Sequence, residues 1–305
     1  MIAALEWLGV RARWVLALGF VAALAAPGLA ERLRPALPFL VACVYALSMA
    51  RLDGRALARD LGSPRRGLLT LALSAALLTV PTAGAWAAVR ALGAGADWEA
   101  AAVWTFAAPP IASAAGLCFL MGWNAGRALQ LTVAASLIMP ALGPAIGAWL
   151  LGAAIPISPL DLGLRTAAMI AGGAVIASAV RAWAGPERIA RNGRVFDGLV
   201  AATMVVFLFP LFDGVGASIL ARPGQAAAFL ALACLFVFGP YVALAFAERG
   251  RAQAGALALV AGTRSTAIYL AALPPDPAFT LYVALYQLPM FATPLVLGAI
   301  LRRRA

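Results

Sequence analysis

Two adjacent prolines in the middle of an apolar stretch are the first sign of a site in this sequence. Pro109 and Pro110 lie within residues 98–121, which otherwise suit one continuous helix. Proline has no amide hydrogen to donate and its ring clashes with the preceding turn, so we expect the helix to open here. Ser113 follows within one turn. Its hydroxyl, together with the amides that begin the next helical segment, favours an anionic or polar ligand.

A second polar cluster interrupts the apolar stretch 253–273. Its residues are Gly262, Thr263, Arg264, Ser265 and Thr266. Placing an arginine near the middle of a bilayer costs about 3 kcal/mol or more, and such residues usually face a pathway or a partner. Two interpretations follow from the sequence. Arg264 faces a hydrated cleft and binds a ligand, or it pairs with the carbonyls of a broken helix or with Asp197 and locks the fold.

Three further polar residues lie in neighbouring apolar stretches. Gln287 lies in residues 278–300, and Gln130 and Thr132 lie in residues 128–152. They line the same cavity, or they make hydrogen bonds between or within helices.

Several kinds of chemistry lack the residues they need. The sequence has no histidine, its three cysteines are far apart, and its acidic residues occur singly near the ends of apolar stretches. Metal sites and nucleophilic catalysis depend on clusters of such groups. We therefore expect neither an enzyme nor a bound metal or cofactor.

The composition predicts the fold class. Hydrophobic residues make up 64% of the 305 residues and charged residues only 11%, whereas a soluble domain carries about 25% charged residues. Spanning a bilayer takes roughly 20 apolar residues. An all-α polytopic membrane protein of about ten transmembrane helices follows, with spans near 14–30, 36–50, 67–90, 98–121, 128–152, 162–182, 195–212, 226–247, 253–273 and 278–300.

The arginines predict the orientation. All 23 basic residues are arginine, and 17 of them fall in joins and ends on one side, against five on the other and Arg264 within a span. Basic residues concentrate on the cytoplasmic side of a membrane. We expect a multi-pass protein of a bacterial inner membrane with both termini in the cytoplasm, in contact with lipids and not with nucleic acid.

The spans divide into two sets of five, residues 1–153 and 158–305. Because five is odd, the second set enters the membrane from the opposite side, as in the inverted repeats of many secondary transporters. The two polar clusters fall in the fourth and ninth spans, which are matching positions of the two repeats.

The residues around both clusters follow the order of a known pattern. The first set is Pro110, Ala112-Ser113-Ala114, Gly122-Trp123-Asn124, Ala128-Leu129-Gln130, Met139-Pro140 and Pro144, and the second is Val260, Gly262, Arg264, Ser265 and Ala267. Together they resemble the bile acid:sodium symporter family over nearly the whole chain. The resemblance implies broken fourth and ninth helices that cross at mid-membrane, and transport by alternating access between a core and a panel of helices.

This chain departs from that family at the cation sites. In that family the Ser-Asn turn, the ninth-helix Glu and the following Gln coordinate sodium. This chain has Ala114 in place of the Asn, Val260 in place of the Glu and Arg264 in place of the Gln. A guanidinium supplies positive charge and hydrogen-bond donors, not oxygen ligands. Our hypothesis is that Arg264 replaces the coupling ion in a sodium-independent secondary transporter of a small organic anion.

Two alternatives remain open on the sequence. A ten-helix transporter of the drug/metabolite type shares the length, the charge bias and the inverted halves, but it predicts continuous fourth and ninth helices. The other alternative is a membrane sensor or scaffold that keeps the fold without transporting a substrate.

Overall fold

The computed structural model describes residues 2–50, 63–152, 155–247 and 252–302, and these residues are almost wholly helical. The described part of the chain contains one isolated β-bridge and no strand. Up to residue 152 the elements are α1 Ile2–Val10, α2 Ala12–Ala25, α3 Pro27–Leu33, the short 3-10 helix η1 Arg34–Ala36, α4 Leu37–Ala50, α6 Pro64–Ala91, α7 Ala96–Ala107, α8 Ala114–Leu120 and α9 Ala125–Leu151.

The second half of the chain follows after residue 154. Its elements are α10 Pro159–Ala184, α11 Pro186–Arg191, α12 Gly193–Leu211, α13 Val215–Ala221, α14 Pro223–Ala247, α15 Ala252–Gly262, α16 Ala267–Ala272 and α17 Pro277–Arg302. The predicted limits of the two repeats at residues 1, 153 and 305 lie outside the described residues.

Many of these helices are long and apolar enough to cross a membrane. The described residues contain six such helices of 19 to 28 residues, and a seventh if the bent pair Ile2–Val10 and Trp14–Ala25, at 92°, forms one span. Large apolar side chains on their outer surfaces are exposed, among them Leu18, Val21, Phe39, Trp149, Val175 and Leu235. Such a surface is unfavourable in water and suits lipid. The predicted all-helical, multi-pass membrane class is confirmed.

One predicted boundary is wrong for a local reason. The sequence predicted a first span over residues 14–30, but the helix ends at Ala25 and a new one begins at Pro27. Proline at the first position of a helix loses no hydrogen bond and its φ suits the helix. The chain therefore turns at Ala26, and the second span is longer than predicted.

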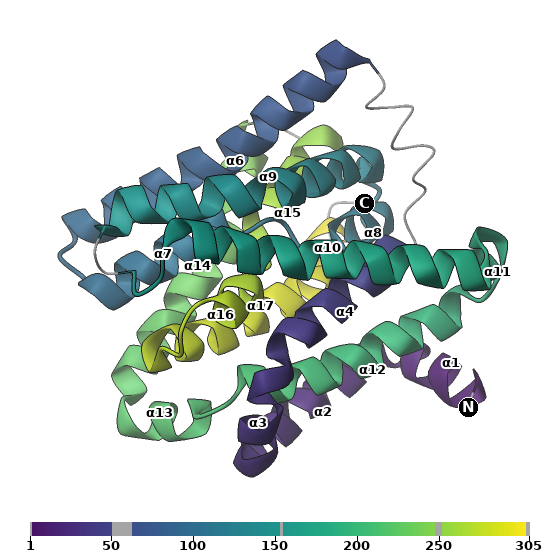
Figure 1. Cartoon of the computed structure of the whole chain (residues 1–305), viewed down its shortest axis with the longest axis horizontal. Helices are drawn as coiled ribbons and strands as arrows, with labels where there is room; N and C mark the ends of the chain where they lie inside the picture. Colours follow the sequence, from purple (N-terminus) through teal and green to yellow (C-terminus); the bar gives the residue numbers. More distant parts are fainter. Residues whose placement is uncertain (1, 51–62, 153–154, 248–251, 303–305) are drawn as a thin grey trace.

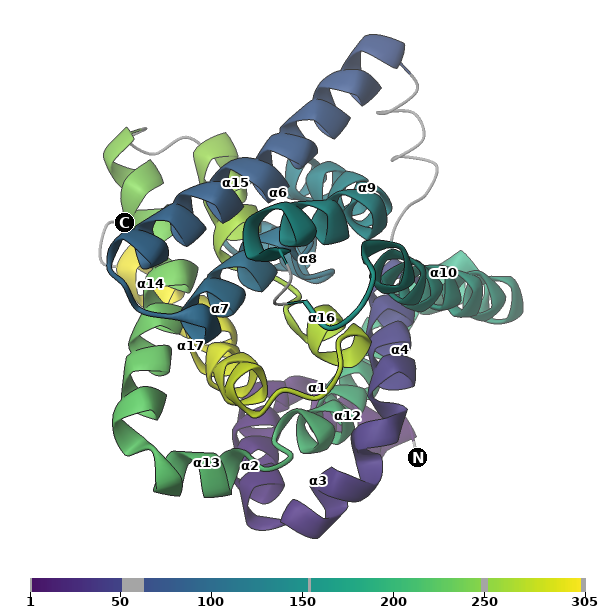
Figure 2. The same ribbon diagram turned by 60° about the vertical axis from the view of Figure 1, so that its left-hand side comes forward.

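The helices form two groups that meet along a limited front (Figures 1 and 2). The first group contains α1–α4 and α10–α12, and the second contains α6–α9 and α14–α17. Between the groups, helix α9 contacts α10, helix α16 contacts α4 and α10, and α12 contacts α17, whereas α13 packs on α14 and α17 of the second group. Figure 2 shows α4 beside α10 at the edge of the first group.

Glycines allow close helix packing inside the first group. A methyl group at Gly173 of α10 would lie 2.8 Å from Cβ of Tyr45 in α4, and one at Gly198 of α12 would overlap the carbonyl of Leu5 in α1. Small residues at such contacts bring backbones together in a membrane, where the hydrophobic effect does not drive helices to associate. These contacts make the first group a closely packed unit.

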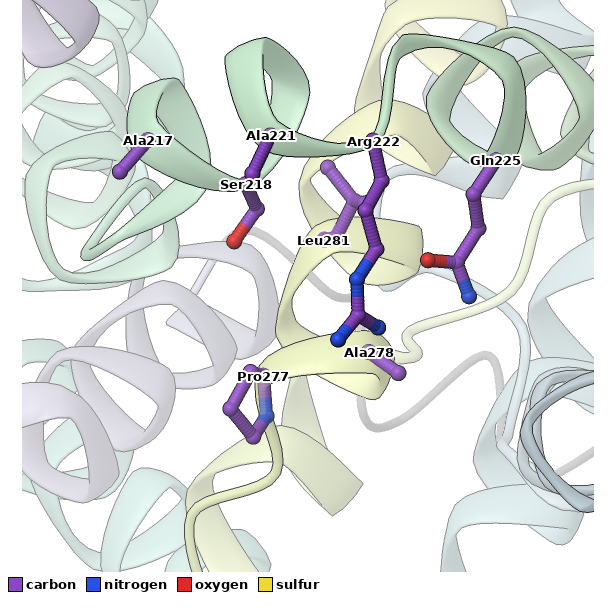
Figure 3. A pocket seen from close by; sticks show the side chains of 8 residues that line it. All are labelled: Ala217, Ser218, Ala221, Arg222, Gln225, Pro277, Ala278 and Leu281. Atoms are coloured by element: carbon purple, nitrogen blue, oxygen red, sulfur yellow. The ribbon is translucent and has the colours of Figure 1, made fainter.

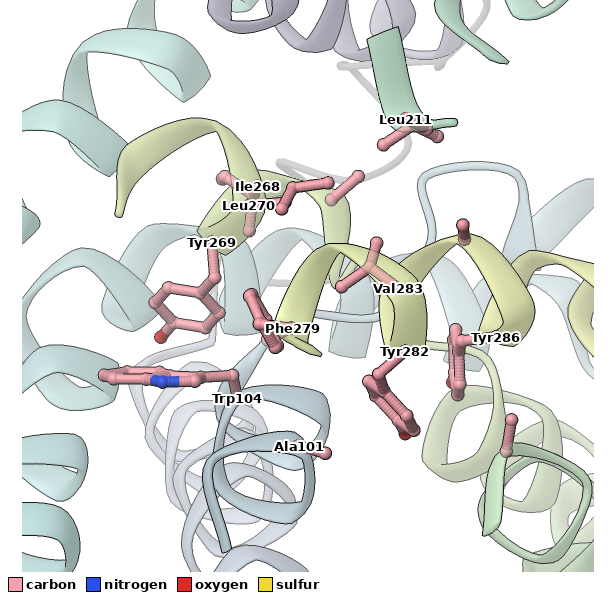
Figure 4. Packing of buried hydrophobic residues seen from close by; sticks show 14 of the residues in the cluster. Ala101, Trp104, Leu211, Ile268, Tyr269, Leu270, Phe279, Tyr282, Val283 and Tyr286 are labelled. Carbon is pink, nitrogen blue, oxygen red and sulfur yellow. The ribbon is translucent and has the colours of Figure 1, made fainter. Parts of the chain in front are cut away.

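Aromatic side chains fill the second group beside the broken segments (Figure 4). The ring of Trp104 in α7 lies 4.6 Å from that of Tyr269 in α16, and the rings of Tyr282 and Tyr286 in α17 are 6.0 Å apart. All four side chains are buried. Their rings fill the core, and the hydroxyls of Tyr269 and Tyr286 reach the backbone at the interruptions, as described below.

Candidate functional site

The first interruption separates α7 from α8. Helix α7 ends at Ala107, Ala108 is extended with φ −72° and ψ 148°, and α8 begins at Ala114. Pro109 and Pro110 follow Ala108 directly, and neither can continue the hydrogen-bond ladder. The helix break that the sequence predicted here is confirmed.

The second interruption separates α15 from α16 and contains no proline. Helix α15 ends at Gly262 and α16 begins at Ala267. A methyl group at Gly262 would overlap the carbonyl oxygen of Val237 in α14, so only glycine lets these backbones approach so closely. The hydroxyl of Thr263 donates to the Leu259 carbonyl at 2.6 Å, which competes with helix continuation. This predicted break is confirmed as well.

The two interruptions pair with each other. Pro110 and Arg264 form an isolated antiparallel bridge, in which the Ile111 amide donates to the Thr263 carbonyl at 3.1 Å and the Ser265 amide donates to the Pro109 carbonyl at 2.8 Å. Irregular backbone is tolerated inside a membrane only where protein or water satisfies it. Each interruption thus satisfies part of the other.

Arg264 binds three backbone carbonyls from three segments. Its Nε donates to Ala261 at 3.0 Å, Nη1 to Ala108 at 3.2 Å, and Nη2 to Leu77 of α6 at 2.8 Å. The guanidinium carbon also lies 5.9 Å from the centre of the Phe106 ring. One fixed cation therefore holds both interruptions and the neighbouring helix together.

This geometry corrects one expectation from the sequence. The exposed fraction of Arg264 is 0%, so its guanidinium does not lie in a hydrated cleft in this structure. Its bonds match the other interpretation, in which the arginine pairs with broken-helix carbonyls. Asp197 is not the partner in those bonds; it lies in α12 beside Gly9 of α1. Direct contact between a substrate and this guanidinium is not supported.

Two tyrosines complete the hydrogen bonding of the interruptions. The Tyr286 hydroxyl donates to the Gly262 carbonyl at 2.8 Å and accepts from the Arg264 amide at 3.0 Å. The Tyr269 hydroxyl donates to the Ala107 carbonyl at 3.2 Å. Sequence reasoning missed both roles. The available signal was a tyrosine within an apolar helix, since a buried tyrosine hydroxyl usually finds a partner.

The structure brings some of the predicted site residues together. Pro110, Gly262, Thr263, Arg264 and Ser265 all lie in the paired interruptions. Thr266 follows directly and is fully buried with no hydrogen-bond partner for its hydroxyl. Ser113 precedes α8, is exposed, and makes no side-chain capping bond.

Other predicted residues have different surroundings. The Gln287 amide donates to the Val283 carbonyl of its own helix at 3.3 Å. Near the start of α9, the side-chain carbonyl of Gln130 accepts from Arg127 at 3.2 Å. Arg127 also donates to the hydroxyl of Thr70 in α6. Thr132 is buried in α9, and its hydroxyl lacks a hydrogen-bond partner. The Gln287 bond therefore stays within α17, and the bond between Arg127 and Gln130 stays within α9.

Two pockets lie apart from the interruptions. One of about 260 Å³ is lined by Ala217, Ser218, Ala221, Arg222, Gln225, Pro277, Ala278 and Leu281 (Figure 3). The other, of about 190 Å³, includes Arg90, Asp97, Glu99 and Asp276. Gln225 donates to Asp97 at 3.4 Å, so a hydrogen bond joins the linings of the two pockets. None of the predicted site residues lines either pocket.

The fold and site define an all-helical, multi-pass membrane protein with two interrupted helices bonded to each other. The sequence matches no protein-family model and no curated protein. The functional argument therefore depends on the geometry of this chain.

Proposed function

We propose that this chain is a secondary transporter of a small organic anion, that it works by alternating access, and that Arg264 replaces the coupling cation of a sodium symporter. The observation that carries the proposal is the position of the guanidinium, bonded to three carbonyls at the paired interruptions. Interrupted helices at matching places in two repeats are typical of secondary transporters.

The replacement of a cation follows from the chemistry of the freed carbonyls. A broken helix exposes carbonyl oxygens, and in many transporters such oxygens coordinate sodium. Here a covalently attached cation bonds carbonyls of Ala108, Ala261 and Leu77. A second cation within several ångströms in a low-dielectric interior would be strongly repelled. Permanent occupation by a guanidinium therefore favours transport that does not require sodium.

The order of the helices supports two inverted five-helix repeats. Five segments precede residue 153, namely α1–α2, α3–α4, α6, α7–α8 and α9, and five follow, namely α10, α12, α14, α15–α16 and α17. The interruption falls in the fourth segment of each set. This supports the proposed similarity to the bile acid:sodium symporter family and the crossing of the broken helices at mid-membrane.

Alternating access needs two bodies that move against each other. The first group of helices supplies a panel, and the second group, with both interruptions, supplies a core. Closely packed helices move as rigid units more readily than they deform. We place the substrate between these groups beside the interruptions, in a bacterial inner membrane with both termini cytoplasmic.

Of the two alternative functions, a drug/metabolite-type transporter and a sensor or scaffold, a specific observation favours the sensor or scaffold. A drug/metabolite-type transporter predicts continuous fourth and ninth helices, whereas both are interrupted here. A sensor or scaffold without transport fits the complete burial of Arg264, because a guanidinium that only locks the fold needs no access.

Counterflow in proteoliposomes tests the proposal. A thermal-shift screen of the purified protein against small carboxylates, with and without sodium, selects ligands. Liposomes loaded with the best ligand are then diluted into trace radiolabelled ligand. We expect accumulation at equal rates in sodium and in potassium. Uptake that collapses without sodium would reject the ion replacement, and absence of counterflow for every ligand that binds would favour the scaffold.

A further inference from the structure

The larger of the two pockets lies at the join between two long apolar helices. Helices α12 and α14 are each long and apolar enough to cross a membrane, and α12 ends at Leu211 while α14 begins at Pro223. The residues between them, which include α13, therefore lie at a membrane surface. Leu220 of α13 is 84% exposed, and a large apolar side chain at this level is favourable when it enters the bilayer. The pocket is thus at the depth of the lipid headgroups.

The shape and lining of this pocket suit one polar group attached to an apolar molecule. Five of its eight lining residues are apolar, and Ser218, Arg222 and Gln225 are the polar ones. Figure 3 shows the Arg222 side chain extending from the join toward Pro277 and Ala278 at the start of α17. The volume of about 260 Å³ is below the roughly 300–1,000 Å³ of pockets that enclose a drug-sized ligand. We therefore expect the pocket to take a headgroup and not a whole molecule.

Arg222 brings hydrogen-bond donors that the protein itself does not use. Within the described ranges, its guanidinium forms no ion pair and no hydrogen bond with another residue. Other arginines near helix ends differ, since Arg90 pairs with Glu99 at 3.8 Å and Arg165 donates to the Ala272 carbonyl at 3.0 Å. A guanidinium has five N–H donors in a planar fork that matches the oxygens of a phosphate or a carboxylate. An anion in this pocket would find those donors available.

The remaining polar groups of the pocket add one donor and no competing anion. The Gln225 side-chain amide donates one hydrogen bond to Asp97 at 3.4 Å and has a second N–H left to donate. The Ser218 hydroxyl already donates to the Gly214 carbonyl. The carboxylates of Asp97 and Asp276 belong to the other pocket, where Asp276 accepts from the first amides of α17. Arg222 and Gln225 are therefore the groups that would hold an anion.

We propose that this pocket binds the phosphate of a membrane phospholipid, with Arg222 and Gln225 as donors and Leu220 beside the acyl chains. Phosphate is the anion that a bilayer supplies at headgroup depth, and an arginine near an anionic membrane surface is attracted to it. The bound headgroup would join α13 to the start of α17, because both line the pocket. This site goes beyond the proposed transport and does not depend on it.

Thermal unfolding of the purified, delipidated protein in dodecyl maltoside tests the ligand class. The probes are dioleoylphosphatidylglycerol, dioleoylglycerol, which has the same chains without the phosphate, and inorganic phosphate. A ligand that binds the folded state raises the melting temperature in a saturable way. We expect this rise with the phospholipid, and no comparable rise with dioleoylglycerol or with inorganic phosphate at the same concentrations.

Two matched variants test the residue. Arg222→Gln is expected to raise the half-saturating concentration of the phospholipid about tenfold, as for the loss of a hydrogen bond between charged groups. Arg32→Gln is the control, because it removes the same charge from an exposed arginine that lines neither pocket. Each variant is compared with its own lipid-free melting temperature, so that a change in stability is not counted as a change in binding.

Three results would overturn the proposal. Equal stabilisation by dioleoylglycerol would show that the phosphate is not recognised, and equal stabilisation by inorganic phosphate would show a site for a free anion. A half-saturating concentration that Arg222→Gln leaves unchanged, or that Arg32→Gln raises equally, would place lipid binding elsewhere. Because no gradient is used, the absence of counterflow would leave the lipid site standing, and the absence of lipid binding would leave transport standing.

Discussion

The interruption between α7 and α8 contains two prolines and no charge, whereas that between α15 and α16 contains an arginine and no proline. In the first, the chain itself prevents a helix, because Pro109 and Pro110 cannot donate to the ladder. In the second, neighbouring residues prevent the helix from continuing. Gly262 admits a neighbouring backbone, and Arg264 and Tyr286 satisfy the groups that the break exposes.

Single prolines elsewhere sharpen the comparison. Pro81 in α6, Pro140 and Pro144 in α9, and Pro210 in α12 all lie inside helices that continue through them. A proline in a membrane helix is tolerated where neighbours satisfy the freed groups. A single proline is therefore not enough to interrupt these helices. At Pro109 and Pro110 it has a pair of prolines and a partner segment that bonds to the opened backbone.

The largest expected effect comes from removing the charge of the second interruption. Arg264→Met keeps an unbranched apolar stem but leaves the carbonyls of Leu77, Ala108 and Ala261 without this donor. Each unsatisfied buried group costs about 1–3 kcal/mol, so we expect a loss of about 3 kcal/mol or more. Thermal unfolding in detergent measures it, with Arg264→Lys as the control that keeps the charge and part of the bonding. An unchanged melting temperature for Arg264→Met would show that the guanidinium does not hold the interruptions.

The next effect comes from making the first interruption helical. The double variant Pro109→Ala with Pro110→Ala removes the barrier to helix continuation, which is about 3 kcal/mol per proline in a helix interior. We expect α7 to lengthen, the amide of Ser265 to lose its bond to residue 109, and proposed transport to fall about tenfold, with less loss of stability than for Arg264→Met.

Hydrogen exchange at Ser265 and counterflow rates measure the change in the double variant. Pro81→Ala in the continuous helix α6 is the control and should leave both unchanged. If the double variant also retains both, the prolines are not what opens the helix.

The two tyrosines compare the interruptions directly. Tyr286→Phe removes two hydrogen bonds from the second interruption, and Tyr269→Phe removes one from the first. Since a hydrogen bond contributes about 1 kcal/mol, we expect losses of about 2 and 1 kcal/mol. Chemical denaturation of both variants in the same detergent gives the ranking. An effect of Tyr269→Phe equal to or larger than that of Tyr286→Phe would contradict the view that the second break depends more on outside partners.

The smallest effect is expected at Gln287. Its amide bonds within its own helix, so Gln287→Leu exchanges a local hydrogen bond for apolar contact of similar size, with a change of about 0.5 kcal/mol or less. Counterflow and thermal unfolding should both stay near the parent values. A loss of transport with unchanged stability would instead restore this residue to the predicted site.

The sequence was informative where the cause of a feature is local. The two breaks were predicted from the proline pair and from the polar run at 262–266, and both are present. The position of Pro27 was equally local, but its effect on the first span was overlooked. The predicted role of Gln287 is less informative, because a polar side chain in an apolar helix can be satisfied within a turn of its own backbone, as Gln287 is by Val283.

Composition, arginine distribution and helix-breaking residues determined by themselves that this chain is a helical membrane protein with two opened segments, because lipid imposes the same demands on every apolar stretch. Only the tertiary structure decided that Arg264 is bonded to carbonyls of three separate segments and that Tyr286 bonds to both Gly262 and Arg264. Ala108 and Leu77 lie 156 and 187 positions from Arg264 in the sequence. No local pattern encodes such pairs, since packing between helices selects them.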